Sequence, residues 1–426
     1  MAGFQGSNTV PLNSNFTPAF NWDSGYPGKL VPGVLNPHVT EQSSVNGYWE
    51  SAIDPHSLSQ GYIHQFNAGA EYALAKDTRL TVNYVGNRGR RLHDGNLATT
   101  EPSAAAELAL WNSYNEWDWV DDAPSAAAAG VTLPYNAFSG YALQAINQFP
   151  QIASQYTTLY FVGTHLGQTN YDAMQVEAMR RTGQGFTFDM SYTLGRAIGD
   201  TGNNFAEEWT TGAFQDFSKL NQEATLPQTS DTRNVLKGYV TYSLPFGHGR
   251  KYLAGNNLAD KFVGGWDATT LLHYNSGQPL PVFATNDYYG WAAVYPNVNL
   301  KGNFGRKFHF GNFVQPTSAN PAPAGDQYFD ATNFTQPAYG SLGTGPEIVS
   351  ALRGFGYAGE DAALLKYTSF GPESRFKLSI RVEFYNLLNR HYFSNPNTNI
   401  ASDQFGYVTS NTGTPRNGQF GARFQW

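Results

Sequence analysis

Apolar and polar side chains alternate without interruption over ten residues near the end of the chain. One face of this stretch holds Phe376, Leu378, Ile380, Val382 and Phe384, and the other holds Lys377, Ser379, Arg381, Glu383 and Tyr385. A period of two predicts an extended strand with one apolar and one polar face. The chain ends in a second such stretch, Gly418–Trp426. Roughly 9–11 residues suffice for a tilted strand to cross a bilayer, but a strand of a soluble β-sandwich shows the same alternation.

The same alternation recurs along the chain and predicts nine strands, arranged as four hairpins and a closing strand. The strands are expected at residues 61–75 and 79–84, 171–178 and 186–194, 236–244 and 266–275, 361–370 and 375–388, and 418–426. His64 interrupts the apolar face of the first strand. Successive hairpins of this kind predict an antiparallel all-β sheet.

The connections between these strands alternate strictly between short and long. Short ones lie at Lys76, Gln184, Pro245 and Pro372, and long ones begin near Gly89, Gly199, Thr285 and Asn389. Up-and-down barrels of the outer membrane have short periplasmic turns and long extracellular loops, whereas long structureless loops are uncommon in compact domains. The pattern therefore predicts an antiparallel up-and-down transmembrane β-barrel in residues 61–426, after an extracellular loop segment in residues 1–60.

The longest predicted loop, Gly89–Asn170, has a distinctive composition. An Ala-rich, acidic and Trp-rich tract at Ala104–Ala129 indicates that part of the loop is helical. Trp111, Trp117 and Trp119 in this tract admit two interpretations. They form a surface that stacks on sugars, or they are aromatic anchors that pin the loop to itself.

Composition favours a membrane barrel and argues against several other classes. Charged residues make up 14% of the chain, against roughly 25% in average soluble domains. No run of about twenty apolar residues predicts a transmembrane helix. The chain has no cysteine, which removes disulfides, thiolate metal sites and cysteine nucleophiles. The net charge of −7, without any basic run, gives nucleic-acid binding no electrostatic support.

Four groups of residues resemble the C-terminal half of a TonB-dependent outer-membrane receptor and transporter. They are YIHQFNAGAEYALAKDTRLTVNYVGNRGRRL, TNYDAMQVEAMRRTGQGFTFDMSYTLGRAI, YSLPFGHGRKYL with GGWDATTLLHYNSGQPLPV, and FKLSIRVEFYNLLNRHYFSNPNTNI followed by FGARFQW. Their order and spacing are similar to those of the Oar-like branch, whose members carry an N-terminal carboxypeptidase-regulatory-like domain. The resemblance covers Gly61–Trp426 apart from the large loops.

The resemblance implies a barrel of about 22 strands around a plug that receives energy from the inner membrane through the TonB complex. This sequence shows no TonB box, plug or first half of the barrel, so the nine strands are expected to be a fragment that lacks its N-terminal plug and barrel half. Met1–Val10 do not form a signal peptide, which leads to the same expectation. Outer-membrane lipid and the barrel assembly machinery of a Gram-negative-type cell are the other expected partners. Phe424 and Trp426 resemble the terminal aromatic signal that this machinery reads.

The polar faces of the predicted strands supply the candidate residues of a lumen. They are Glu71, Arg79, Glu177, Asp189, Lys237, Asp267, His273, Lys377, Arg381, Glu383 and Arg423. These residues either contact a substrate or pair with one another and with a plug across a wet interior. Aromatic residues near strand ends are expected to form girdles at the membrane interfaces. They include Tyr62, Tyr84, Tyr192, Trp266 and Phe376.

No catalytic constellation or cofactor motif accompanies these residues. Neither a nucleophile elbow nor the metalloprotease HExxH pattern is present, so neither an enzyme nor a cofactor is expected. Asp200–Glu208 loosely resembles a calcium loop but lacks the EF-hand spacing and its glutamate at position twelve. His248 and Gly249 fall in a turn and are expected to be structural.

Three functions remain open on the sequence alone. The first is energised uptake of a siderophore, oligosaccharide, peptide or protein, to which this chain contributes wall and external loops. The second is a barrel scaffold that displays aromatic loops, such as Tyr288–Trp291, for adhesion or glycan binding. The third is a barrel-embedded hydrolase, which needs converging Ser/His or Asp/His residues that the sequence does not show.

Overall fold

The computed structural model divides the chain into two compact units, residues 1–59 with 95–164 and residues 60–94 with 165–426. It describes residues 50–53, 60–92, 104–113, 115–146, 150, 159–162, 167–182, 185–199, 227, 230–247, 250–252, 262–284, 295–338, 343–346 and 348–426. All the predicted barrel strands belong to the second unit.

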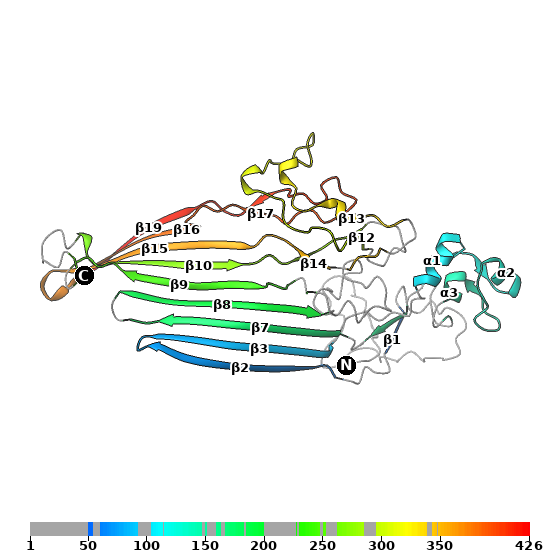
Figure 1. Cartoon of the computed structure of the whole chain (residues 1–426), viewed down its shortest axis with the longest axis horizontal. Coiled ribbons are helices and arrows are strands. Elements are labelled where there is room, and N and C mark those ends of the chain that lie inside the picture. The colour runs from blue at the N-terminus through cyan, green and yellow to red at the C-terminus, as the bar shows by residue number, and fades with distance from the viewer. Residues whose placement is uncertain are drawn as a thin grey trace, which may run out of the picture. The chain divides into compact units, whose positions relative to one another are not determined.

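The second unit is organised around one antiparallel sheet of nine strands (Figure 1). In spatial order they are β2 (Tyr62–Ala75), β3 (Thr78–Leu92), β7 (Gly167–Arg180), β8 (Phe186–Gly199), β9 (Asn234–Ser243), β10 (Trp266–Asn275), β15 (Tyr357–Phe370), β16 (Phe376–Tyr385) and β19 (Asn417–Gln425). Sequential strands are neighbours throughout, so the sheet is an up-and-down meander. The nine strands and the all-β class predicted from the sequence are confirmed. Within the described residues the sheet is open, with β2 and β19 at its edges.

Register divides the side chains of the sheet into an even face and an odd face, named after residue numbers. Residues that lie opposite each other on neighbouring strands are both even-numbered or both odd-numbered. The two exceptions are the last pairs beyond the bulges of β2 with β3 and of β3 with β7. Leu80, for example, lies opposite both Tyr72 and Ala178. Opposite residues point to the same side of a sheet. The even face therefore collects the apolar positions of the strands, and the odd face collects the polar ones.

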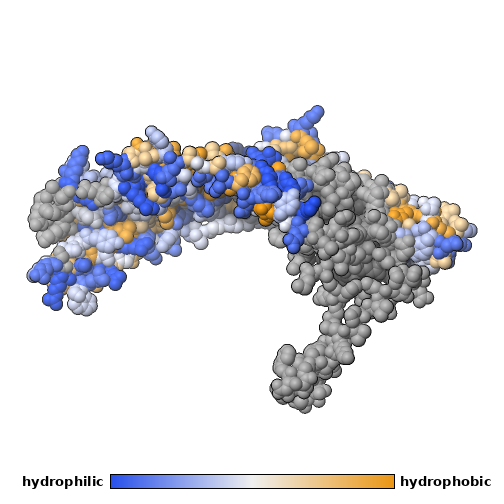
Figure 2. All heavy atoms as spheres, turned by 90° about the horizontal axis from the view of Figure 1, so that it is seen from below, coloured by the Kyte–Doolittle hydropathy of each residue, from blue (hydrophilic) through white to orange (hydrophobic). Residues whose placement is uncertain are grey.

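The two ends of the sheet differ in their connections. The short connections all lie at one end, the turn end, together with the C-terminus (Figure 1). One of them is the single-turn helix η6 (Pro372–Ser374), which follows Gly371 with its positive φ of 83°. Hydrophilic residues, in blue, gather at this turn end in Figure 2. The long connections lie at the opposite end, the loop end.

Three strands extend further toward the loop end than the alternation predicts. β3 continues to Leu92, β7 already begins at Gly167 and β8 runs to Gly199. The extensions remain paired with their neighbouring strands, but polar residues occupy both of their faces. The alternation of apolar and polar residues that predicts a strand is therefore absent there. The loop expected to start at Gly89 therefore starts later, and that predicted boundary is wrong.

The long connections after β10 and β16 fold together into a compact loop domain, which their polar composition did not predict. Its elements are β11 (Pro279–Pro281), β12 (Asn297–Val298), η3 (Phe310–Asn312), η4 (Ala324–Asp326), η5 (Ala331–Asn333), β13 (Phe334–Thr335), β14 (Ile348–Arg353), β17 (Tyr392–Phe393) and β18 (Asn411–Thr412). Its core consists of Leu280, Val282, Phe304, Phe308, Tyr328, Phe329, Phe334, Val349, Leu352, Phe393, Phe405 and Val408. The expectation that residues 285–359 and 389–416 are plain loop is therefore wrong where these segments are described.

The first unit contains three helices, of which the first two lie in the Ala-rich tract, where helix was expected, and the third lies beyond it. They are α1 (Ala104–Ser113), α2 (Ala123–Ala128) and α3 (Ala142–Ala145), accompanied by short strands β1 (Glu50–Ile53), β4 (Trp119–Val120), β5 (Gly140–Tyr141) and β6 (Leu159–Val162). Asp122 begins α2 with a capping box, in which it accepts the Ser125 backbone N–H at 2.8 Å. β1 pairs with β6, although the two strands lie in two separate segments that were both predicted to be loop. Among the helices of the described segments, none has the length and apolar character needed to cross a membrane.

Candidate functional site

All eleven candidate lumen residues lie on the odd face of the sheet. Four of them share one row that crosses six strands, in which each position lies opposite the next. The row runs Glu71, Thr81, Glu177, Ser191, Lys237 and His273. The odd face thus carries a band in which acidic and hydroxyl groups alternate over four strands and Lys237 and His273 follow. Such a band can contact a polar solute or a polar protein surface.

Several of these candidates are bonded to one another or to neighbouring polar groups. Arg79 lies 3.4 Å from a carboxylate oxygen of Glu71, and Arg381 pairs with Glu383. The Ser243 hydroxyl donates to Asp267 at 2.6 Å. These contacts, within one strand or between adjacent strands, favour the interpretation in which lumen charges pair with one another. A role for any of the eleven residues in substrate binding stays a prediction.

The even face exposes large apolar side chains along its whole width. They include Tyr62, Phe66, Tyr72, Leu74, Val82, Tyr84, Met174, Leu194, Tyr242, Leu364, Phe384 and Phe420. At the turn end, Phe376 stacks on Phe370 with ring centroids 5.6 Å apart and on Phe424 at 5.9 Å. Trp426 stacks on Phe424 at 6.0 Å. A wide apolar face with aromatic residues at its border is typical of a lipid-facing barrel wall.

Met190→Arg is expected to destabilise the membrane-inserted sheet by about 2–4 kcal/mol, because it places a charge near the middle of the lipid-facing band. Met190 lies on β8 between Phe188 and Tyr192, opposite Ala178 and Gly238. The measurement is urea unfolding in lipid vesicles.

Ser191→Arg is the matched control, since the adjacent side chain points to the odd face. We expect Ser191→Arg to lower the free energy of unfolding only slightly. Equal costs for the two variants would contradict the assignment of the even face to lipid.

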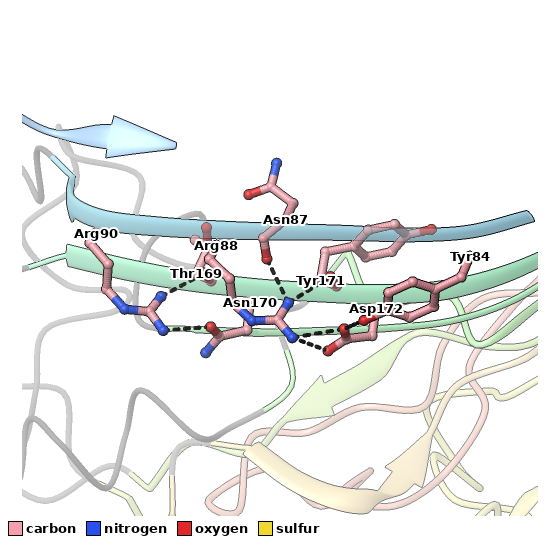
Figure 3. Close-up of polar contacts among 8 residues, drawn as sticks. All are labelled: Tyr84, Asn87, Arg88, Arg90, Thr169, Asn170, Tyr171 and Asp172. Carbon is pink, nitrogen blue, oxygen red and sulfur yellow. Dashed lines mark hydrogen bonds and ion pairs between the residues drawn. The ribbon is translucent and has the colours of Figure 1, made fainter. Parts of the chain in front are cut away.

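The loop end of the even face carries a polar network, the rim cluster, which consists of Tyr84, Arg88, Arg90, Asn170, Asp172 and Arg196. Arg88 donates from Nη2 to both carboxylate oxygens of Asp172, at 2.8 and 3.1 Å. The Tyr84 hydroxyl donates to the same carboxylate at 2.5 Å. Figure 3 shows both arginines on one side of the strands, while the Asn87 side chain points to the other side. Arg196 is exposed and lies opposite Asp172.

The rim arginines also connect β3 and β7 through their backbones. Arg88 Nη1 donates to the carbonyls of Asn87 and Tyr171, at 2.8 and 3.0 Å. Arg90 Nη1 donates to those of Gly89 and Thr169, at 2.7 and 3.1 Å. The strand register shifts between Gly89 and Leu92. The guanidinium groups therefore link the two strands over the last regular pairs before the register shift.

A second charged cluster lies on the even face near the ends of β10 and β15. Arg390 binds the buried Glu360 carboxylate through Nε and Nη2, at 2.8 and 2.6 Å. The Tyr274 hydroxyl donates to the same carboxylate at 2.6 Å. Asn386 and Asn389, both with φ of 50°, form the turn that leads to Arg390. Such bidentate pairs hold a carboxylate firmly and satisfy its lone pairs.

The sequence did not predict either cluster, because the polar strand faces that indicate a lumen are odd-numbered and both clusters lie on the apolar, even-numbered face. The available signal was a charge at an even position of a strand, and it is present at Arg88, Asp172, Arg196 and Glu360. Lys366 is a further case nearer the turn end. Its ammonium group donates to the Gly264 carbonyl and lies 5.4 Å from the centroid of the Trp266 ring, so its charge is compensated.

A buried ion pair connects the loop domain to the segment that precedes β9. Arg353 Nη2 lies 2.5 Å from Oδ2 of the buried Asp231. Asp231 Oδ1 also accepts the backbone N–H of Ala197, at 2.7 Å. The Tyr328 hydroxyl donates to the Arg353 carbonyl at 2.7 Å, and burial raises the pKa of Tyr328 to about 12. This network fixes the loop domain above the ends of β8 and β9.

Acidification toward about pH 2 is expected to weaken the loop domain through Asp330. The hydroxyl of Thr332 and the ammonium of Lys307 hold the pKa of Asp330 below its ordinary 3.8, at about 2. Because the folded pKa is the lower one, the stabilisation is complete above the ordinary value and is lost as the pH falls through about 2. Loop-domain unfolding measured against pH should show this loss, and Asp330→Asn should reduce it. An unchanged pH profile in that variant would contradict the assignment.

Several predicted features lie outside the described residues. They are the calcium-like stretch Asp200–Glu208, the turn residues His248 and Gly249, and the aromatic stretch Tyr288–Trp291. In the part of the chain that the structure describes, no group of three or more His, Cys, Asp or Glu side chains is arranged to hold a metal ion.

A family model described as an outer membrane beta barrel domain matches residues 1–419. The chain therefore belongs to this family of outer-membrane β-barrel proteins. The family places the chain in the outer membrane. Outer-membrane barrels turn their apolar face to lipid and have short periplasmic turns and long extracellular loops, which corresponds to the even face, the turn end and the loop end of this sheet. Among curated proteins, none matches the chain.

Solved outer-membrane transporters and receptors are similar to this chain at low identity. The transporter YddB from Escherichia coli is 8% identical with a TM-score of 0.39, and the match covers 88% of this chain and 34% of YddB. The ferripyoverdine receptor of Pseudomonas aeruginosa is 10% identical with a TM-score of 0.32, covering 86% of this chain and 27% of the receptor. The ferric citrate transporter FecA is 11% identical with a TM-score of 0.31, covering 85% and 31%. The chain thus spans about a third or less of these proteins.

Proposed function

We propose that this chain is the C-terminal part of the barrel wall of a TonB-dependent transporter of the Oar-like branch. In this proposal an N-terminal plug and barrel half complete the wall, and the TonB complex supplies energy through the plug. The loop domain faces the exterior, where substrate arrives, and residues 1–60 are an extracellular loop segment. The charged row on the odd face lines the path.

The direction of the two edge strands carries this proposal. β2 runs from the loop end to the turn end, and β19 runs the same way. Joining β2 to β19 directly would give a parallel seam, and so would pairing with a second copy in the same membrane orientation. An antiparallel barrel therefore needs an odd number of further strands between them. About 13 more strands would complete a barrel of roughly 22 strands, the number found in outer-membrane transporters with a plugged lumen.

Photo-cross-linking from the edges tests the proposal in intact outer membranes. A photoreactive residue at Ala70 of β2 or Ala422 of β19 is expected to form adducts with strands other than the nine of this sheet. The same residue at Ala178, inside the sheet, should form adducts only with β3 and β8. Adducts between positions 70 and 422, or with a second copy of the nine strands, would contradict the proposal. Loss of substrate uptake on deletion of the TonB complex would support the proposal that this complex supplies the energy for transport.

A scaffold that displays aromatic groups for glycan binding is the second candidate. Trp117 and Trp119 are 48% and 54% exposed, and both contact Tyr141 edge-on, at 5.8 and 5.3 Å. Rigid, half-exposed aromatic rings of this kind can stack on sugar rings. Glycan-dependent adhesion that Trp119→Ala abolishes, in cells that keep normal uptake, would favour this function.

A further inference from the structure

We propose that the rim cluster is a docking surface for the phosphorylated headgroup of a glycolipid in the outer leaflet of the outer membrane. The inference requires the membrane placement of the family but not the transporter proposal. Its ligand is a lipid with at least one phosphate on a sugar headgroup. The arginines Arg88, Arg90 and Arg196 bind the phosphate, and the apolar even face next to them contacts the acyl chains.

The position of the arginines is the first argument. On β3 the apolar even positions end at Tyr84, and on β8 they are interrupted after Leu194, where Arg196 follows two residues later. Two residues of strand span roughly 7 Å. This rise separates Arg196 from Leu194. Arg88 lies four residues beyond Tyr84, but its guanidinium reaches back to Asp172, which lies opposite Arg196. Arg90 lies one step further, beside Asn170. The guanidinium groups of Arg88 and Arg196 therefore lie just beyond the apolar band, on the side that faces lipid and at the extracellular end. Lipid headgroups occupy this level.

The balance of charge is the second argument. The rim cluster contains three arginines and one carboxylate, that of Asp172, and therefore has a net charge of +2. His64 lies opposite Arg88 on β2 and adds a polar ring. Among the described residues, compensation within the rim cluster leaves this excess positive charge facing the membrane. A phosphate headgroup, with one or two negative charges, matches it.

The hydrogen-bonding capacity of the arginines is the third argument. Among the described residues, the bonds of Arg90 to Gly89, Thr169 and Asn170 use three N–H groups, out of the five of a guanidinium. Arg88 is more fully engaged, because four bonds hold it to Asn87, Tyr171 and Asp172. Arg88 is thus a positioning residue, whereas Arg90 and the exposed Arg196 retain donors for a ligand.

Continuity with the apolar face favours a lipid over a free anion. The same side of the sheet presents Phe66, Met174 and Leu194 immediately toward the turn end. A phosphorylated lipid engages both the arginines and this surface, whereas inorganic phosphate engages only the arginines. Affinity should therefore depend on both the phosphate and the acyl chains.

The test compares lipid binding by the protein as it is extracted with mild detergent from outer membranes. Native mass spectrometry measures occupancy by a bisphosphorylated acylated glucosamine disaccharide and by its dephosphorylated form. Each rim arginine is expected to contribute on the order of fivefold in affinity. Arg90→Gln with Arg196→Gln should therefore weaken binding of the phosphorylated lipid by roughly 25-fold, and high salt should weaken it in the parent chain.

The control is Arg381→Gln with Arg423→Gln, which removes the same charge from the odd face. Unchanged lipid binding in this control supports the proposal. Equal loss in both double variants, or equal binding of the dephosphorylated lipid, would overturn it. Full competition by inorganic phosphate at the concentration of the lipid would also overturn it, because the cluster would then be a simple anion site.

Discussion

Replacing Arg353 by methionine is expected to destabilise the loop domain by about 3–5 kcal/mol. Arg353 is the charged partner of the buried Asp231, with 2.5 Å between Nη2 and Oδ2. Its Nη1 also donates to the carbonyls of Asp231 and Gly277, at 3.0 and 3.2 Å. Methionine keeps an unbranched side chain in the same space but leaves the buried carboxylate without its cation. The cost arises mainly from that unpaired charge.

Hydrogen exchange of the β14 amides, followed against urea, measures this effect directly. Arg306→Met is the matched control, because the exposed Arg306 lies over the Phe310 ring at 5.1 Å from its centroid and is expected to contribute no more than about 1 kcal/mol. A double variant, Asp231→Leu with Arg353→Met, should recover much of the loss, since an apolar pair needs no compensation. Similar costs for the Arg353 and Arg306 variants would contradict the role of the buried pair.

The nine strands could be predicted from the sequence because alternation is a local property of a half-buried strand. Each strand has one apolar face and one polar face within its own ten or so residues, as Phe376 to Tyr385 illustrate. The alternation of short and long connections then gave the topology, because the two sides of a membrane impose different loop lengths. Both inferences use neighbours in the sequence and need no knowledge of distant contacts.

The loop domain could not be predicted in this way. Its core joins Leu280, Phe329 and Val408, which lie far apart in sequence and belong to short strands, turns and irregular segments. The apolar residues of this core do not recur over long stretches of the chain at the spacing of two or 3.6 residues that marks a strand or a helix. Leu280, Phe329 and Val408 each come from a separate segment, and these segments run in different directions. The polar composition of the segments hides the core, since most of their residues face solvent.

The rim cluster was hidden for a related reason. The hydropathy pattern stops near Tyr84 on β3, but the strand continues to Leu92 with polar residues on both faces. The alternation of apolar and polar residues predicts a strand only where its two faces differ in polarity, so it cannot predict the part of β3 in which both faces are polar. Arginine at successive even positions, Arg88 and Arg90, was nevertheless a readable sign that the lipid-facing side changes character there.

Phe329→Ala is expected to destabilise the loop domain by about 3–5 kcal/mol, because it removes an aromatic side chain from the centre of the core. Phe329 is fully buried. Its ring lies edge-on to Phe334 and Phe405, with centroids 5.5 and 5.3 Å away. These partners come from the connection after β10 and from that after β16, so the ring joins the two halves of the domain. Their contacts are lost together when the ring is removed.

Urea-dependent hydrogen exchange of β13 and β14 amides measures the loss, and added benzene distinguishes a cavity from a general collapse of the domain. An apolar cavity of ring size binds benzene, so saturating benzene should restore part of the stability of Phe329→Ala and leave the parent chain unchanged. Leu300→Ala, at a side chain that is 63% exposed, is the control and should cost less than about 0.5 kcal/mol. Comparable losses in the two variants would mean that the buried aromatic core does not hold the loop domain together.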